Sequence, residues 1–200
     1  MCLCILKLLL INERMYVNMK KTLKPDTNLV PVPAVMVSCG DMENSNIITI
    51  AWTGIINSNP PMIYISIRDT RYSYDIIKDN KEFVVNIPSE NLIWETDFCG
   101  TKSGRNIDKF KEAKLTKEMC TKVKAPSILE CPINLECKVR EIKKLGSHDM
   151  FIAEIVAVNA EEKYILDGKL NLDKLDLITY VSPNYNTASK KIGERGISLK

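Results

Sequence analysis

The chain has 200 residues, of which 45% are hydrophobic and 26% charged, a balance typical of soluble globular proteins and not of disordered ones. Its formal net charge is +3, and the 28 Lys and Arg residues are scattered along the chain, which argues against binding to nucleic acid. A chain of this length suits one domain whose core needs neither disulfides nor a metal.

The cysteine and histidine content argues against a metal site. Seven cysteines are present without a CxxC pair, and His148 is the sole histidine. A zinc site needs clustered ligands, so we expect no metal. An odd set of thiols without regular spacing is typical of small core residues in a reducing cytosol, and we therefore expect a cytoplasmic protein.

The N-terminal segment is apolar but short. Residues 2–11 could not cross a bilayer, which takes about 20 residues, and neither a basic start nor a small-residue cleavage site accompanies them. Met19, Lys20 and Lys21 look like a natural beginning. We therefore interpret residues 1–18 as an extension and residues 19–200 as one domain that is not bound to a membrane.

The first strands alternate small or polar residues with apolar ones. Residues 29–39 predict a strand whose prolines, Pro31 and Pro33, place it at an edge or at the start of a sheet. After a turn, residues 46–54 predict a second strand, and residues 62–68 a third. Each has an apolar face and a polar face. The second strand's small face holds Thr49, Ala51 and Thr53, opposite Ile48, Ile50 and Trp52, and the third strand's apolar face holds Ile63, Ile65 and Ile67.

Short helices follow. Asp69 or Thr70 can cap a helix that runs through Asp79 and buries Ile76 and Ile77, and residues 81–87 return to strand. Ser89 opens another short helix, and a third surrounds Ile107 and Phe110.

The second half of the chain indicates more strands. Residues 129–139 alternate clearly, which predicts a long antiparallel strand whose apolar residues point inward while Asn134 and Glu136 point outward. Residues 151–158 are apolar on both faces, as in a strand buried in a core or under a partner subunit. A short strand near residues 164–165 precedes the turn at 167–168. Strands outnumber helices, so we expect a barrel, which leaves no exposed edges.

The basic residues near the start of the first predicted helix could bind an anion. Arg68, Arg71 and Ser73 lie where free backbone N–H groups and the helix dipole favour negative charge, and arginine adds bidentate hydrogen bonds. These residues could also simply be solvated. The row Thr49, Ala51 and Thr53 could support a flat ring, or could be the solvent side of a sheet, and the apolar face predicts Trp52 in the core.

Six motifs in register resemble one known family. They are Asn46-x-x-Thr49-x-Ala51-Trp52-Thr53, Asn59-Pro60-Pro61, Ser66-x-Arg68-x-x-Arg71-x-Ser73, Phe83-Val84-Val85-Asn86, Ser103-Gly104 with Asp108-Lys109-Phe110, and Gly146-Ser147-His148. Over roughly residues 25–185 this order resembles the flavin reductase-like domain, close to flavoredoxins. The resemblance implies a mainly β protein, a six-stranded antiparallel Greek-key split β-barrel with short helical insertions. It also implies a homodimer with one FMN per subunit near the interface.

The resemblance also assigns roles to residues. His148, beside the open face of the flavin, and Lys109, close to the flavin ring, are the candidate catalytic residues. Otherwise Lys109 is a surface lysine and His148 a turn residue. The implied cofactor-binding residues are Asn46, Thr49, Ala51, Trp52 and Thr53 for the ring and ribityl chain, Ser66, Arg68, Arg71 and Ser73 for the phosphate, and Lys109.

Three functions remain open at this point. The first is a flavin reductase that passes electrons from NADH or NADPH through FMN to a free flavin or another acceptor. The second is a flavoredoxin-like carrier that keeps FMN tightly bound and exchanges electrons with a partner protein. Asn59 and Trp52 depart from the reductase pattern and keep this second possibility open. A non-flavin binder, such as a haem-associated relative, lacks a ligand motif beyond one histidine.

Overall fold

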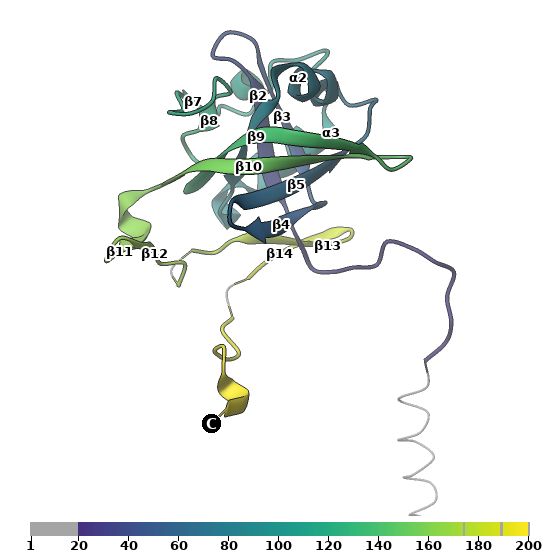
Figure 1. The fold of residues 1–200 in the computed structure, drawn as a ribbon, viewed down its shortest axis with the longest axis vertical. Coiled ribbons are helices and arrows are strands. Elements are labelled where there is room, and N and C mark those ends of the chain that lie inside the picture. Colours follow the sequence, from purple (N-terminus) through teal and green to yellow (C-terminus); the bar gives the residue numbers. More distant parts are fainter. Residues whose placement is uncertain (1–19, 174, 189, 200) are drawn as a thin grey trace, which may run out of the picture.

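The structure, a computed structural model, describes residues 20–173, 175–188 and 190–199. The predicted extension at residues 1–18 lies outside this range. The largest element of the described chain is an antiparallel sheet in the order β3-β2-β6-β9-β10-β5-β4. Its strands are β2 (Val35–Gly40), β3 (Ser45–Ile50), β4 (Thr53–Ser58), β5 (Pro61–Ile67), β6 (Glu82–Ile87), β9 (Ile133–Lys144) and β10 (Asp149–Ala160). Figure 1 shows β9 and β10 as a long hairpin across the sheet.

The sheet closes on itself through a bend between its two edge strands. β3 and β4 stand at opposite ends of the strand order, yet only Ala51 and Trp52 separate them in the chain. The backbone N–H of Ser66 on β5 donates to the carbonyl oxygen of Trp52, at 2.9 Å. The predicted strand 46–54 is therefore divided in two, which is why the sheet has seven strands where six were expected.

The barrel core contains the residues that the period-two pattern selected. Ile48 and Ile50 of β3 face inward and meet Ile63, Ile65 and Ile67 of β5, all of them buried. All six residues of β2 are buried, because Val35, Val37 and Cys39 pack in this core and Met36 packs in a second one on the other face. Pro31 and Pro33 precede β2, and Pro33 ends the short strand β1 (Val32–Pro33) in a separate sheet. The expectation that the prolines stand at the start of the sheet is confirmed.

Helices pack against β3 and its neighbours. α2 (Tyr72–Asn80) begins close to its predicted cap and buries Ile77 fully and Ile76 in part. The 3₁₀ turn η1 (Glu90–Leu92), α3 (Ile93–Thr101) and α4 (Lys109–Glu112) follow. A second core holds Met36, Ile47, Cys99 and Phe110 together. β3 is thus buried on both faces, with alternate residues in two different cores.

The first half of β9 is not exposed to solvent on its predicted outward side. Asn134 is buried and Glu136 is 0% exposed, so both expectations were wrong. Residues 121–123 cross this face of the strand, and their backbone N–H groups donate to the Glu136 carboxylate. The strand also begins at Ile133, not at Leu129. Alternation identified the strand correctly. It could not show that Glu136 is buried, because a polar residue whose hydrogen bonds are all supplied by the protein gives the same sequence pattern as a solvated one.

The remaining elements are short. β1 pairs with β13 (Ile178–Val181), which pairs with β14 (Asn184–Thr187). The others are β7 (Lys117–Glu118), β8 (Ser127–Ile128), η2 (Glu162–Tyr164), β11 (Ile165–Leu166), β12 (Lys169–Leu170) and η3 (Ile197–Leu199). Within the described ranges, none of the helices has the length and apolar character that crossing a bilayer requires.

Candidate functional site

Two adjoining cavities lie at the end of β3, between β5, α2 and α3. The first, the Trp52 cavity, has a volume of about 190 Å³. The second, the Ser73 cavity, measures about 60 Å³. Ile48 and Arg71 line both, so the two cavities are neighbours. The Trp52 cavity is lined by Ile48, Thr49, Ile50, Ala51, Trp52, Ser66, Ile67, Arg68, Arg71 and His148. The Ser73 cavity is lined by Asn46, Ile48, Thr70, Arg71, Tyr72, Ser73, Cys99, Gly100, Lys102, Ser103, Gly104 and Lys109.

The charge of both cavities is positive. Arg68 follows directly after β5, and Arg71 is the N-cap residue of α2, with extended backbone and no side-chain cap hydrogen bond. Within the described ranges, neither guanidinium group has a hydrogen-bond or ion-pair partner, and no residue that lines the two cavities carries a carboxylate. The first turn of α2 adds N–H groups that the helix itself does not use. This arrangement favours an anionic ligand.

The Ser73 cavity is shaped by the close approach of the loop at Gly104 to β3 and α2. Asn46 is buried, and its Nδ2 donates to Oγ of Ser73 at 2.8 Å. A Cβ atom at Gly104 would lie 2.1 Å from Oδ1 of Asn46 and 2.9 Å from the ring of Tyr72. Any side chain at position 104 would therefore displace Asn46 and close the cavity. Sequence reasoning predicted a loop here but did not select Gly104, Tyr72 or Lys102 as site residues.

Lys109 is buried, with 4% of its surface exposed, so the surface-lysine interpretation is wrong. Its Nζ donates to the carbonyl oxygens of Ile47 and Cys99, at 2.7 Å each. Burial lowers the pKa of Lys109 below its usual value. An ammonium group has three protons to donate, so one remains for the Ser73 cavity that Lys109 borders. Contact between Lys109 and a ligand stays a prediction.

The cysteines near Lys109 are not activated thiols. Cys39 and Cys99 are both buried, and this burial raises the pKa of each to about 11. Both are therefore protonated at neutral pH. Cys131 and Cys137 are also buried, which confirms that these thiols are core residues.

Trp52 and His148 form the outer wall of the Trp52 cavity. Trp52 is 41% exposed, so its predicted place in the core was wrong. The reason is the bend after β3, which interrupts the alternation just before Trp52. Its ring lies 4.5 Å from the imidazole of His148, centroid to centroid, with 44° between the planes. Burial, followed by the charges of Arg68 and Arg71, lowers the pKa of His148.

The threonine hydroxyls of the predicted small row have internal partners. Thr49 borders the Trp52 cavity, and its hydroxyl donates to the carbonyl of Thr96 on α3, at 2.5 Å. Thr53 is buried, and its hydroxyl donates to the carbonyl of Tyr64 on β5, also at 2.5 Å. The structure therefore gathers nine of the ten predicted cofactor-binding residues, and His148, around the two cavities, while Thr53 lines neither.

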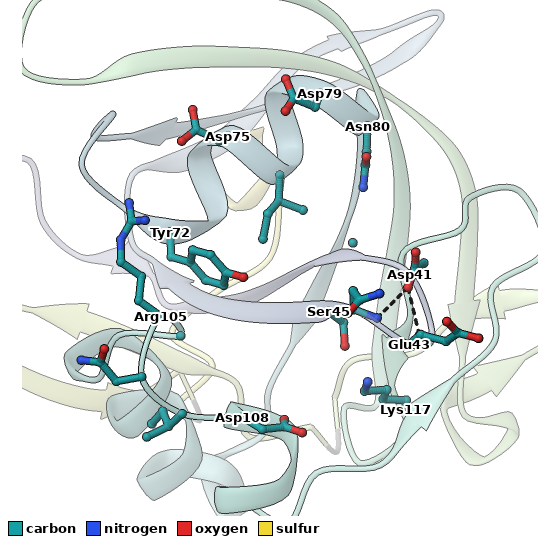
Figure 2. A pocket seen from close by; sticks show the side chains of 16 residues that line it. Asp41, Glu43, Ser45, Tyr72, Asp75, Asp79, Asn80, Arg105, Asp108 and Lys117 are labelled. Atoms are coloured by element: carbon teal, nitrogen blue, oxygen red, sulfur yellow. Dashed lines mark hydrogen bonds between the residues drawn. The ribbon is translucent and has the colours of Figure 1, made fainter.

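A larger cavity of about 680 Å³ adjoins the Ser73 cavity but has the opposite charge character. The two share Tyr72 and Gly104. Figure 2 shows carboxylates around this larger cavity. They belong to Asp41, Glu43, Asp75, Asp79 and Asp108. Arg105 and Lys117 are its two basic residues. Size alone would place a ligand here, but the carboxylates disfavour an anion, and of the sequence-predicted site residues none lines it.

The fold and the two cavities describe an antiparallel barrel with a positively charged site at one edge strand, and comparison with known proteins identifies the class. The chain belongs to the flavin reductase like domain family, which matches residues 27–172. A protein of Pyrococcus abyssi is 31% identical over 154 residues, which cover 77% of this chain and 88% of the relative.

Solved structures agree with this assignment. The flavoredoxin of Desulfovibrio vulgaris (Miyazaki F) superposes with a TM-score of 0.82 at 31% identity, over 91% of this chain and 100% of that one. The flavoredoxin from Methanosarcina acetivorans superposes with a TM-score of 0.79 at 29% identity, over 90% of this chain and 100% of that one. A Shewanella frigidimarina protein described as having a split barrel domain superposes with a TM-score of 0.74 at 20% identity, over 82% of this chain and 85% of that one. The predicted split-barrel fold is confirmed.

Proposed function

We propose that this protein binds FMN along the two adjoining cavities and acts as a flavin-dependent redox protein. The observation that carries the proposal is Arg71. Its guanidinium borders both cavities, has no ion-pair partner within the described ranges, and stands at the open N-terminus of α2. This is the charge pattern that a phosphate monoester requires.

The residues fit a flat ring with an anionic tail. Arg68, Arg71, Ser66 and Ser73 supply donors for the tail at the junction of the cavities. Ala51 and Thr49 present small side chains beside Trp52, where a ring can lie close to the backbone of β3. FMN, when bound, supplies the capacity to accept and release one or two electrons. The protein's residues hold it, exclude water from part of it and adjust the charge around it.

Lys109 and His148 are the residues we propose to act near the reacting ring. Lys109 keeps a positive charge in a buried position, where a cation stabilises negative charge on a reduced ring. His148 stands on the exposed side of the Trp52 cavity, where a second substrate has to arrive. The electron source in this proposal is NADH or NADPH, and the acceptor is a free flavin or another redox partner. We further propose that the protein is a cytoplasmic homodimer.

A second candidate is an electron carrier with tightly bound FMN and no nicotinamide turnover. Two observations favour it. The Trp52 and His148 rings together cover the outer side of the cavity, and the two superposed flavoredoxins have higher identity to this chain than the Shewanella protein.

Two measurements test the proposal. The absorption spectrum of the purified protein, before and after addition of FMN and gel filtration, should show the two-band spectrum of bound oxidised flavin. NADH and NADPH oxidation with and without added FMN then separates the candidates: turnover identifies the reductase, and a reducible bound flavin without turnover identifies the carrier. A colourless protein that does not retain added FMN contradicts both.

A further inference from the structure

His148 shares the wall of the Trp52 cavity with two cations that have no counter-ion. Arg68 and Arg71 approach from the end of β5 and the start of α2, and His148 approaches from the turn before β10. Oγ of Ser147 lies 3.0 Å from Nδ1 of His148. Within the described part of the chain, Nε2 of the imidazole has no hydrogen-bond partner. One ring nitrogen is thus available to whatever occupies the cavity.

The surroundings of this imidazole disfavour its protonated form. Burial lowers the pKa of His148, and the two guanidinium groups lower it further. The neighbouring carboxylate, Asp149, is buried and accepts a hydrogen bond of 2.5 Å from the hydroxyl of the buried Tyr74. Across the hairpin, Asp149 is paired with Lys144 of β9, which is a further positive charge. A dianion placed beside Arg68 and Arg71 would reverse the local potential.

We propose that His148 is a third anion-binding residue of the Trp52 cavity and that it takes up a proton when a tetrahedral dianion, such as the terminal group of a phosphate monoester, binds beside Arg68 and Arg71. The proposal deepens the proposed function, because the phosphate of FMN is such a group, but the cavity chemistry does not require a flavin. Binding energies are reciprocal, so the factor by which the anion favours the protonated imidazole equals the factor by which protonation favours the anion.

The size of the effect follows from this reciprocity. A rise of one pKa unit at His148 corresponds to about tenfold tighter anion binding to the protonated form. Between the pKa values of the free and the anion-bound protein, anion affinity then falls by about tenfold for each pH unit of increase. Below the lower pKa and above the higher one, the affinity no longer depends on this proton.

The chain contains one histidine, so the experiment has a single, unambiguous signal. The imidazole resonances of the full chain are followed by NMR from about pH 5 to about pH 8, without and with saturating sulfate. Sulfate stays a dianion over this range, whereas a phosphate monoester has its own second pKa at about 6. We expect sulfate to raise the pKa of His148 by about one unit or more. Sulfate binding that leaves this pKa unchanged overturns the proposal, as does an absence of sulfate binding.

Flavins separate this proposal from the proposed function. FMN should raise the pKa of His148, whereas riboflavin, which has the ring but no phosphate, should leave it almost unchanged. An equal rise with both flavins would mean that His148 responds to the ring, which overturns the anion assignment while leaving flavin binding intact. A rise with sulfate in a protein that binds neither flavin would support the anion assignment and contradict the proposed function.

A variant gives an independent readout. In His148→Gln, which keeps a hydrogen-bond donor but cannot take up a proton, sulfate affinity should lose its pH dependence and match that of the wild type at high pH. Arg140→Ala, which removes a cation on β9 that is not part of the cavity, should keep the wild-type pH dependence. Unchanged pH dependence in His148→Gln would assign the titration to another group and overturn the proposal.

Discussion

Two charged regions of this barrel differ in where their counter-charge comes from. Glu136 of β9 is fully buried, and its carboxylate accepts hydrogen bonds from the backbone N–H groups of Thr121, Lys122 and Val123 and from Nδ2 of Asn159. Arg68 and Arg71 lie at the cavity surface without a hydrogen-bond or ion-pair partner in the described ranges. The first region is a completed anion site whose anion belongs to the chain. The second is an anion site still open to a ligand.

This difference separates charged groups that stabilise the fold from charged groups that are available to a ligand. A buried charge with all its hydrogen bonds supplied by the chain stabilises the fold, and its removal leaves unsatisfied donors. Charges that converge on a cavity without internal partners contribute little to the folded state and are available for binding. Substitutions in the two regions should therefore affect different measurements.

The largest effect on stability should come from removing the Glu136 carboxylate. Glu136→Ala leaves several N–H donors and the Asn159 amide without their acceptor in a buried place. We expect a loss of about 3 kcal/mol or more in the free energy of unfolding, measured by urea denaturation. Flavin affinity of the folded fraction should not change. A loss below about 1 kcal/mol would mean that water replaces the carboxylate easily and that the comparison fails.

The open site should give the reverse result. Arg71→Ala should weaken FMN binding by about 1.5–3 kcal/mol, the contribution of a charge-assisted hydrogen bond, with the free energy of unfolding almost unchanged. Quenching of FMN fluorescence measures the affinity, and Arg140→Ala is the control. Riboflavin affinity should depend much less on Arg71, because riboflavin lacks the phosphate. An FMN affinity equal to that of the wild type would remove Arg71 from the site.

Lys109 tests the boundary between the two kinds of charge. Its two hydrogen bonds to Ile47 and Cys99 are structural, while its position at the Ser73 cavity points to a ligand. Lys109→Met keeps the volume but leaves two carbonyl oxygens without a donor, and we expect a loss of about 1–2 kcal/mol of folding stability, because removing the buried charge offsets part of the cost. If Lys109 is also a ligand-binding residue, FMN affinity of the folded variant falls as well.

The Glu136 site should also make the stability of the fold sensitive to acid. Burial raises the pKa of Glu136, but the hydrogen bonds from Thr121, Asn159 and Lys122 together lower it more, so the folded protein holds this carboxyl below its usual pKa. Its contribution to stability is therefore complete above about pH 4.5 and is lost as the pH falls through the lower, folded-state pKa. Unfolding measured from pH 6 to pH 3 should show a flatter decline in Glu136→Gln than in the wild type.

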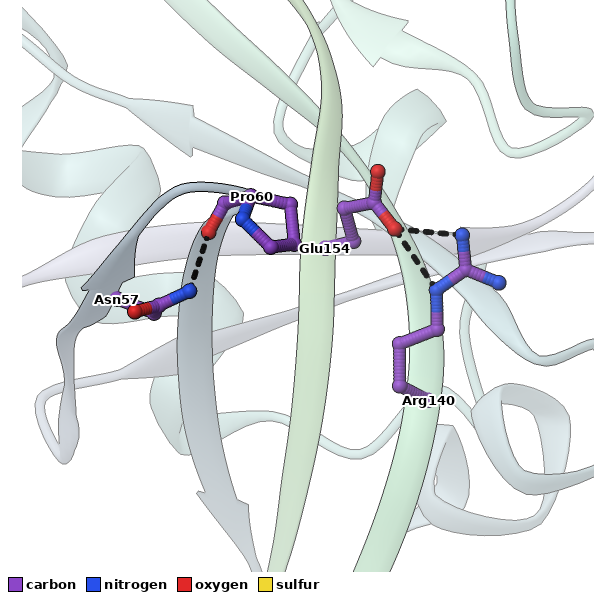
Figure 3. A network of polar contacts seen from close by, with 4 residues as sticks. All are labelled: Asn57, Pro60, Arg140 and Glu154. Carbon is purple, nitrogen blue, oxygen red and sulfur yellow. Dashed lines mark hydrogen bonds and ion pairs between the residues drawn. The ribbon is translucent and has the colours of Figure 1, made fainter.

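The smallest effect should come from an exposed ion pair. Arg140 and Glu154 pair across β9 and β10, at 2.6 Å, on the solvent side of the hairpin (Figure 3). Glu154→Ala should cost less than about 1 kcal/mol, and 0.5 M salt should reduce even that difference. A larger loss would show that a short distance alone, without burial, is enough to stabilise the barrel.

The parts predicted well from sequence are those where a local pattern determines the structure. Alternation in β3 and β5 identified the core isoleucines, and the cap region identified α2. The motif positions also gathered around the two cavities, with Thr53 as the exception. In each of these cases the chain's own neighbours fix which way a side chain faces.

The wrong predictions have two other causes. Trp52 was assigned to the core because the alternating pattern was extended through a bend that no turn-forming residue in the sequence marks. Glu136 was assigned to the surface, and for Lys109 a surface position was left open beside the flavin site, because charge usually indicates solvent. Distant segments of the chain supply the hydrogen-bond partners of both residues. Burial of a charge depends on partners far apart in sequence, so a local pattern does not reveal it.

The bend at Ala51 and Trp52 limits how this site can change. It joins strands at opposite edges of the sheet with only two residues, both of which line the Trp52 cavity. An added or deleted residue would either open the ring of strands or rotate the indole away from the imidazole. New ligand preferences at this place must therefore arise by exchanging side chains, because the connection has no freedom to grow.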